Sequence, residues 1–149
     1  MDRSRLDIRW LAAAVVALII LVVGIGTCGG VDTGDPEASV RSYFDAVADG
    51  DGEDACSVGT EEFQEAAVAS VIGTPSQGDS CEETVENVPD EAREVVEDVE
   101  AKTIEKTDTT ATVEVELKEE GAPAQSYRFP LIREGDEWLI EGPPEQVSE

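Results

Sequence analysis

The stretch that decides the fold is Ala111-Thr-Val-Glu-Val-Glu-Leu-Lys118. Apolar and polar residues alternate strictly along it, which is the period of a β-strand with one buried face. One set of side chains is therefore expected to face a core: Ala111, Val113, Val115 and Leu117. The intervening set is expected on the opposite face: Thr112, Glu114, Glu116 and Lys118.

Three further strands are expected around this one. They cover 99–106, 127–131 and 137–141, with turns or loops at 107–109, 119–124 and 135–136. Thr103-Ile104 blurs the alternation of the first, and Pro130 suggests an edge or a bulge because proline cannot donate to a ladder. Gly142-Pro-Pro144 is expected to end the ordered region, leaving 143–149 as a flexible tail.

Helical signals precede the strands. Asp35 can cap a helix that starts at Pro36, and its apolar stripe (Val40, Tyr43, Phe44 and Val47) follows the helical period up to the turn at 49–52. Shorter helices are expected at 53–58, at 61–71 after Thr60, after the Ser80/Glu83 capping box, and at 91–97. The pattern predicts an α+β domain over 36–142, with helices packed on one face of a four-stranded antiparallel sheet.

An uncharged segment, Trp10–Cys28, lies before this domain. As a helix it would span roughly 27 Å, about the thickness of a bilayer core, and basic residues in 1–9 favour a cytoplasmic start. Three alternatives remain: an uncleaved anchor, a cleaved signal peptide, or a lipoprotein, since Ile25-Gly-Thr-Cys28 resembles a lipobox that departs from the pattern at Thr27. Each places the chain after a 29–35 linker outside the cytoplasm, with lipidation at Cys28 in the third.

The charge balance excludes several partners. Net charge is −25, and beyond the first nine residues the chain carries 33 acidic against 7 basic residues. Such a surface repels nucleic acid and anionic headgroups. The chain has no His, and the acidic turn 49–54 lacks the Gly and the final Glu of a calcium loop, so neither a metal nor another cofactor is expected.

Several of these segments together carry a family resemblance. They are Val40-Arg-Ser-Tyr-Phe-Asp-Ala-Val-Ala-Asp-Gly-Asp51, Ala55-Cys56, Cys81, the strand 110–115, and Leu131-Ile-Arg-Glu-Gly-Asp-Glu-Trp-Leu-Ile140. Over about 36–142 the chain resembles the nuclear transport factor 2-like superfamily, in particular its small membrane-anchored extracytoplasmic members of the kind common in actinobacteria. The resemblance implies a curved sheet wrapped around helices into a cone with a pocket, and sheet-to-sheet dimers are frequent in that family.

Cys56 and Cys81 are the two cysteines of the folded region. Outside the cytoplasm a disulfide is the expected state, which also agrees with the two-cysteine arrangement of the resembling proteins. Two buried free thiols are the alternative. A zinc site is disfavoured because there is no His and no third cysteine nearby.

The side chains expected to line a pocket of the cone are Tyr43, Phe44, Val113, Val115, Tyr127, Phe129 and Trp138. Tyr43 is the one candidate for isomerase-like chemistry, but the inward-facing strand positions offer no carboxylate to act with it. We therefore expect a membrane-tethered, non-enzymatic binding or interaction domain, with a homodimer through the sheet face or another protein as partner. The alternative is a small-ligand binder or a cyclase- or isomerase-like enzyme.

Overall fold

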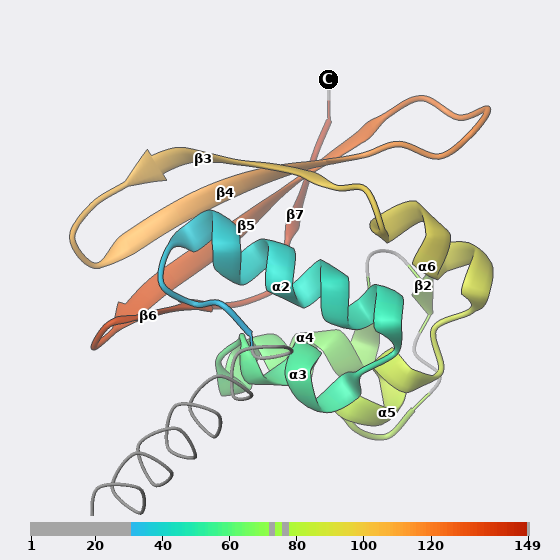
Figure 1. Cartoon of the computed structure of the whole chain (residues 1–149), viewed down its shortest axis with the longest axis horizontal. Coiled ribbons are helices and arrows are strands. Elements are labelled where there is room, and N and C mark those ends of the chain that lie inside the picture. The colour runs from blue at the N-terminus through green and yellow to red at the C-terminus, as the bar shows by residue number, and fades with distance from the viewer. Residues whose placement is uncertain (1–30, 72–73, 76–77, 149) are drawn as a thin grey trace, which may run out of the picture. The chain divides into compact units, whose positions relative to one another are not determined.

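A computed structural model of the chain describes residues 31–71, 74–75 and 78–148 (Figure 1). Helices come first: α2 (Pro36–Asp49), α3 (Gly52–Ser57), α4 (Glu61–Ala69), α5 (Cys81–Glu86) and α6 (Asp90–Val96). The main strands follow as β3 (Glu100–Lys106), β4 (Thr110–Leu117), β5 (Gln125–Glu134), β6 (Glu137–Ile140) and β7 (Glu145–Val147). The α+β prediction is confirmed.

The predictions for 1–9, for the apolar segment 10–28 and for Cys28 fall outside the described residues. Among the residues that are described, none of the helices has the length and apolar character that crossing a membrane requires.

Helix α2 begins and ends where the sequence predicts. The Asp35 carboxylate accepts hydrogen bonds from the N–H groups of Glu37 and Ala38, and Pro36 occupies the first turn. Gly50 closes the helix with φ 71°, a left-handed conformation that glycine adopts without strain. At α5 the Ser80 hydroxyl accepts the N–H of Glu83 as predicted, and the Glu83 carboxylate accepts the N–H of Asp79, one residue before the cap.

The main sheet is antiparallel in the order β3-β4-β5-β6, and β7 pairs with β5. The expected four-stranded sheet therefore has a fifth strand, and the expected flexible tail 143–149 contains it. Ser126, Tyr127 and Arg128 of β5 pair with β7, while the later part of β5, from Leu131 on, pairs with β6. One side of β5 is thus shared between two short strands.

Pro130 lies where β5 changes from one partner strand to the other. It pairs with Thr112 of β4, and its carbonyl accepts the N–H of Glu141, just beyond β6. Its missing N–H costs no ladder bond, because neither β6 nor β7 reaches this position. We predicted an edge or a bulge at Pro130. In the structure β5 is an inner strand, and Pro130 lies in the gap between β6 and β7, which pair with the same side of β5.

The blurred alternation of the first strand is a β-bulge. The register between β3 and β4 shifts between Thr103 and Glu105, so that Ile104 is the additional residue. The bulge leaves Ile104 39% exposed. Among the described residues, it is the one large hydrophobic residue that is exposed to solvent.

Two segments differ from expectation. The helix expected to reach 71 ends at Ala69, and Ser70–Val71 form β1, which pairs with β2 (Thr74–Pro75) inside the expected loop. The predicted linker is partly bound to the domain, because the Thr33 carbonyl accepts the N–H of Trp138, and Asp32 donates to the Ser42 hydroxyl. The hydrogen-bonded domain therefore extends from about residue 32 to 147.

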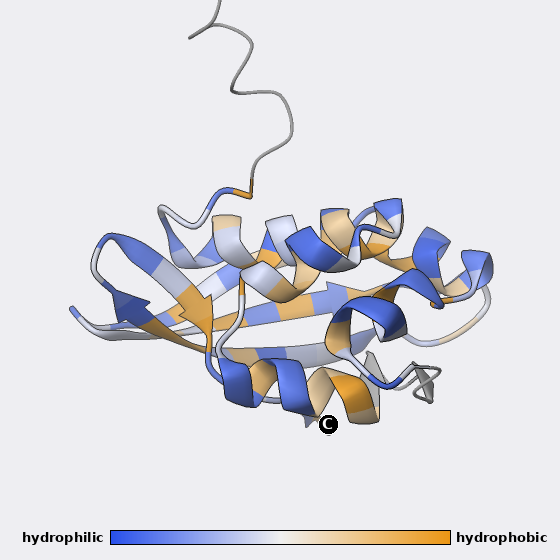
Figure 2. Cartoon of the chain, turned by 90° about the horizontal axis from the view of Figure 1, so that it is seen from below, coloured by the Kyte–Doolittle hydropathy of each residue, from blue (hydrophilic) through white to orange (hydrophobic). Residues whose placement is uncertain are grey.

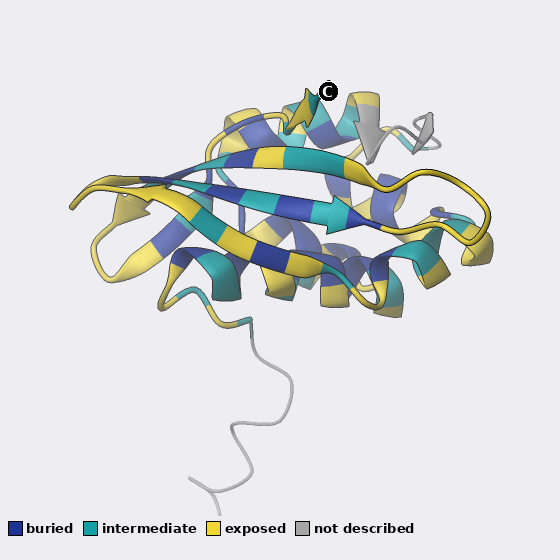
Figure 3. Cartoon of the chain, turned by 90° about the horizontal axis from the view of Figure 1, so that it is seen from above, coloured by how far each residue is buried: buried dark blue, intermediate teal, exposed yellow. Residues whose placement is uncertain are grey.

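The helices lie on one face of the main sheet, and the core fills the space between them (Figure 1). Buried and exposed positions alternate along the strands, as Figure 3 shows from the sheet side, and hydrophobic and hydrophilic segments alternate along the helices in Figure 2. Ala111, Val113, Val115 and Leu117 are buried, so the inward register predicted for β4 is confirmed. Phe129 and Leu131 of β5 are buried as well.

Candidate functional site

Most of the residues expected to line a pocket are packed against one another. Tyr43 lies 5.2 Å, centroid to centroid, from Phe44 and from Phe63, and Phe44 lies 5.6 Å from Phe129. These pairs meet edge to face, the favoured geometry for aromatic rings, and fill the space under the sheet. Val113 and Val115 are fully buried beside them.

Burial raises the pKa of the Tyr43 hydroxyl above its ordinary value. Trp138 is buried elsewhere, under Lys106 and Arg133, whose charged groups lie 5.5 and 6.0 Å from the ring centroid. Of the seven expected residues, Tyr127 is the one that lines a hollow.

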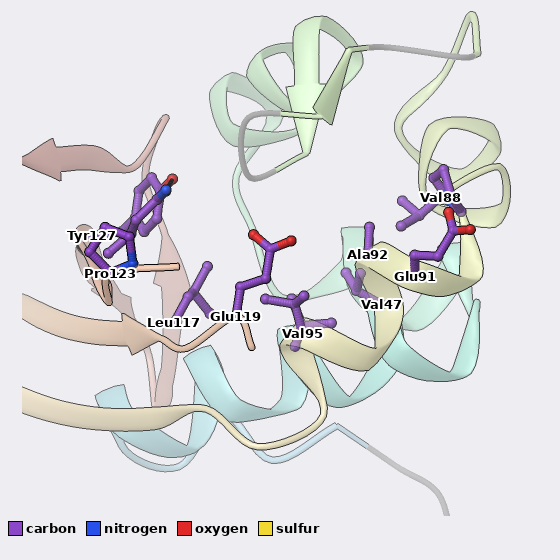
Figure 4. Close-up of a pocket in the computed structure, with 12 residues that line it drawn as sticks. Val47, Val88, Glu91, Ala92, Val95, Leu117, Glu119, Pro123 and Tyr127 are labelled. Atoms are coloured by element: carbon purple, nitrogen blue, oxygen red, sulfur yellow. Dashed lines mark hydrogen bonds between the residues drawn. The ribbon is translucent and has the colours of Figure 1, made fainter. Parts of the chain in front are cut away.

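That hollow has a volume of about 330 Å³ and lies between α6 and the ends of β4 and β5 (Figure 4). We call it the α6 hollow. Its lining is Val47, Val88, Pro89, Glu91, Ala92, Val95, Val96, Leu117, Glu119, Pro123, Gln125 and Tyr127. In Figure 4, side chains of and just before α6 form one wall, Pro123 and Tyr127 form the other, and the Glu119 carboxylate extends between them.

Local sequence explains both walls. Ala92, Val95 and Val96 share one face of α6, at the helical spacing i, i+3 and i+4. The opposite wall depends on the β4–β5 connection, which turns at Gly121 with φ 84° and brings Pro123 to the rim. The hollow is therefore the space left between α6 and the β4–β5 connection that turns at Gly121.

Two carboxylates, Glu91 and Glu119, are the only charged groups in the lining. Both side chains are exposed, and within the described residues neither takes part in an ion pair. At the rim, the Tyr127 hydroxyl donates to the Gln125 amide oxygen at 2.8 Å. The hollow thus combines an apolar floor with an acidic, hydrogen-bonding rim.

The cations nearest in sequence are directed elsewhere. The ammonium nitrogen of Lys118 lies 3.2 Å from a carboxylate oxygen of Glu116 and 3.5 Å from one of Glu100. The pKa of this ammonium group is raised by its hydrogen bond to Glu116 and by the negative charges of Glu100 and Glu116. Arg93 donates to the Glu86 carbonyl at 2.7 Å, and its guanidinium packs against Gly50. Neither cation lines the α6 hollow.

Sequence reasoning missed most of this lining. The i, i+3, i+4 spacing in 91–97 was a usable signal for an apolar face on α6, and Gly121 marked the turn. Whether a face is covered or left open depends on distances between elements, which no local pattern contains.

A disulfide joins Cys56 of α3 to Cys81 of α5, so the predicted pairing is confirmed. The two helices also approach closely at Gly52, where an added Cβ would overlap the backbone of Glu82. No group of three or more His, Cys, Asp or Glu side chains in the described residues is arranged to hold a metal.

The sheet face turned away from the helices carries ion pairs. Lys102, Glu114 and Arg128 stand opposite one another on three neighbouring strands, and Arg128 lies 3.2 Å from Glu114. A second, wider hollow of about 710 Å³ extends from this face, where Ile104, Glu105, Thr112, Arg128 and Pro130 line it, to the segment 141–145 and to Glu62 of α4. We call this surface the open sheet face.

No protein-family model, no curated protein and no solved structure matches the chain.

Proposed function

We propose that this chain is a membrane-tethered, extracytoplasmic, non-enzymatic binding domain, and that the α6 hollow is its ligand site. The observation that carries the proposal is the hollow itself: about 330 Å³, with an apolar floor and a few polar groups at the rim. This is the size and composition of a small-molecule site. The resemblance to the nuclear transport factor 2-like superfamily belongs to the same proposal, supported by the helices on one face of the antiparallel sheet.

A non-enzymatic role is supported by the position of Tyr43. This side chain, the one catalytic candidate of the sequence, is buried among aromatic rings and does not line the hollow. A general acid or base must come within hydrogen-bond reach of its substrate, which Tyr43 cannot do from the core.

A neutral apolar probe tests the binding site. We expect 4-phenylbutan-1-ol, added to the full chain in non-ionic detergent, to shift the methyl resonances of Val95 and Leu117. Ala92→Phe should abolish the shifts by filling the hollow, whereas Ala69→Phe, at an exposed position of α4, should preserve them. Unchanged spectra in the native chain would contradict a small-molecule site.

The membrane tether is supported by the apolar segment 10–28 behind three arginines and by the disulfide, which suits an oxidising compartment. We expect protease added outside intact bacterial spheroplasts to digest the domain, while the full chain fractionates with membranes. Cys28→Ala distinguishes the two tethers: loss from the membrane indicates lipidation, and retention indicates an uncleaved anchor. Protection of the domain from external protease would contradict export.

A homodimer through the open sheet face is the second candidate, and its charge supports it. The strands place three cations there, Lys102, Lys118 and Arg128, among carboxylates that include Glu100, Glu105, Glu114, Glu116 and Glu145. The share of cations is thus higher on this face than in the chain after residue 9, which carries 33 acidic against 7 basic residues, and the face also carries the exposed Ile104. Repulsion between two copies is therefore weaker here than over a surface of average charge.

Sedimentation of the full chain in density-matched non-ionic detergent tests this dimer. Ile104→Asp should shift the chain to monomer, because a carboxylate would be buried against the partner. Ala69→Asp adds the same charge at an exposed site outside the face and should leave the dimer intact. A native chain that is monomeric at all concentrations would exclude the homodimer.

A further inference from the structure

We propose that the ligand of the α6 hollow is a small amphipathic cation, an ammonium group on an apolar body. This inference rests on the proposed binding function and adds the chemical class of the ligand. It follows from where Glu91 and Glu119 stand relative to the apolar floor and to the nearest cations.

The floor fixes the apolar part of the ligand. Val47, Val88, Val96 and Leu117 are buried beneath the hollow and present methyl groups to it, while Val95 and Ala92 are half-buried in its wall. None of these side chains can hydrogen-bond a polar ligand body. Burying apolar ligand surface here removes it from water, which favours binding by roughly 25 cal/mol per Å².

The rim fixes the charge. Glu91 stands on the helix wall, and Glu119 extends from the strand wall into the gap, so a ligand seated on the floor has a carboxylate on each side (Figure 4). Lys118 and Arg93, the cations nearest to them in sequence, are held by Glu116 and by the Glu86 carbonyl. An anionic ligand would meet two carboxylates without a counter-charge.

The Tyr127 ring adds a third favourable group. It lies in the wall next to Pro123, and an ammonium group over an aromatic face is attracted by the ring quadrupole. The volume of about 330 Å³ suits a small molecule and not a folded segment of protein.

Three probes that differ only in their head group test the inference: 4-phenylbutylamine, which is protonated at pH 7, 4-phenylbutan-1-ol and 4-phenylbutyrate. Dissociation constants come from methyl shifts of Val95 and Leu117 in the full chain in non-ionic detergent. At low salt we expect the amine to bind about five- to tenfold more tightly than the alcohol, and the carboxylate to bind most weakly. The advantage of the amine should shrink at about 1 M NaCl.

Two double variants separate the hollow from the overall charge. Glu91→Gln with Glu119→Gln should remove the advantage of the amine. Glu94→Gln with Glu120→Gln changes the same helix and the same loop by the same charge, outside the lining, and should retain it. Each probe also partitions into the detergent, but to the same extent for every variant, so this partition does not affect the comparison between variants.

The possible failures are distinct. Equal affinity of amine and alcohol in the native chain, or equal losses in both double variants, would overturn the cationic ligand while alcohol binding still supported the hollow as a site. No shifts with any of the three probes would overturn the binding function and this inference with it.

Discussion

At the residue scale, Tyr43 shows what a buried ionisable group does to stability. Its hydroxyl lies in the aromatic core, and burial raises its pKa because the phenolate would lose its hydration. In the unfolded chain the group has a pKa near 10. The folded state therefore binds the phenolic proton more tightly than the unfolded chain does. The resulting contribution of Tyr43 to the unfolding free energy is complete below pH 10 and is lost as the pH rises above 10.

We predict that the native chain loses roughly 1.4 kcal/mol of unfolding free energy between pH 8 and pH 11 through this residue. Urea denaturation of Tyr43→Phe at the two pH values should lack that part of the loss. Tyr127→Phe, which leaves the core tyrosine in place, should retain it. Identical alkaline losses in the native chain and in Tyr43→Phe would show that other groups are responsible.

At the element scale, α3 and α5 depend on each other. Each has six residues, too few for a stable helix in isolation, and the Cys56–Cys81 disulfide holds them together across a separation of 25 residues. Closing a loop of this length stabilises a fold by about 3–4 kcal/mol in the chain-entropy account.

Reduction of the disulfide should therefore lower the unfolding free energy of the chain by about 3–4 kcal/mol, measured by urea denaturation with and without reductant. The Cys56→Ala/Cys81→Ala variant should start from the lowered value and no longer respond to reductant. A native chain whose urea midpoint ignores the reductant would refute the prediction.

The elements also show what a sequence can predict. The strict alternation of β4 and the caps of α2 and α5 are local signals, and those elements lie where they were expected. Strand β7 has no such signal, because Glu145–Val147 becomes a strand only by pairing with the side of β5 that β6 leaves free. Tyr127 and Phe129 share one alternation, yet one lines the hollow and the other lies in the core.

At the scale of the whole molecule, charge dominates. After residue 9 the chain carries 33 acidic against 7 basic residues, so its excess carboxylates repel one another in the compact state, and dissolved salt screens that repulsion. We predict that the unfolding free energy rises steadily as NaCl increases from about 20 mM to about 1 M, measured with urea because it is uncharged. Sucrose of equal osmolality should give a smaller rise, and a urea midpoint that falls with salt would contradict the prediction.

The few lysines of the described domain all lie on or next to β3 and β4. Lys102 and Lys106 lie on β3, Lys118 follows β4, and all three side chains are exposed. An amine-reactive reagent therefore attaches to this domain only along its first two long strands. A biosensor surface coupled through amines would hold every molecule by that region or by the chain's own amino terminus, so such a coupling would obscure the homodimer. Coupling through Lys118 would also bring the surface next to Glu119 at the rim of the α6 hollow.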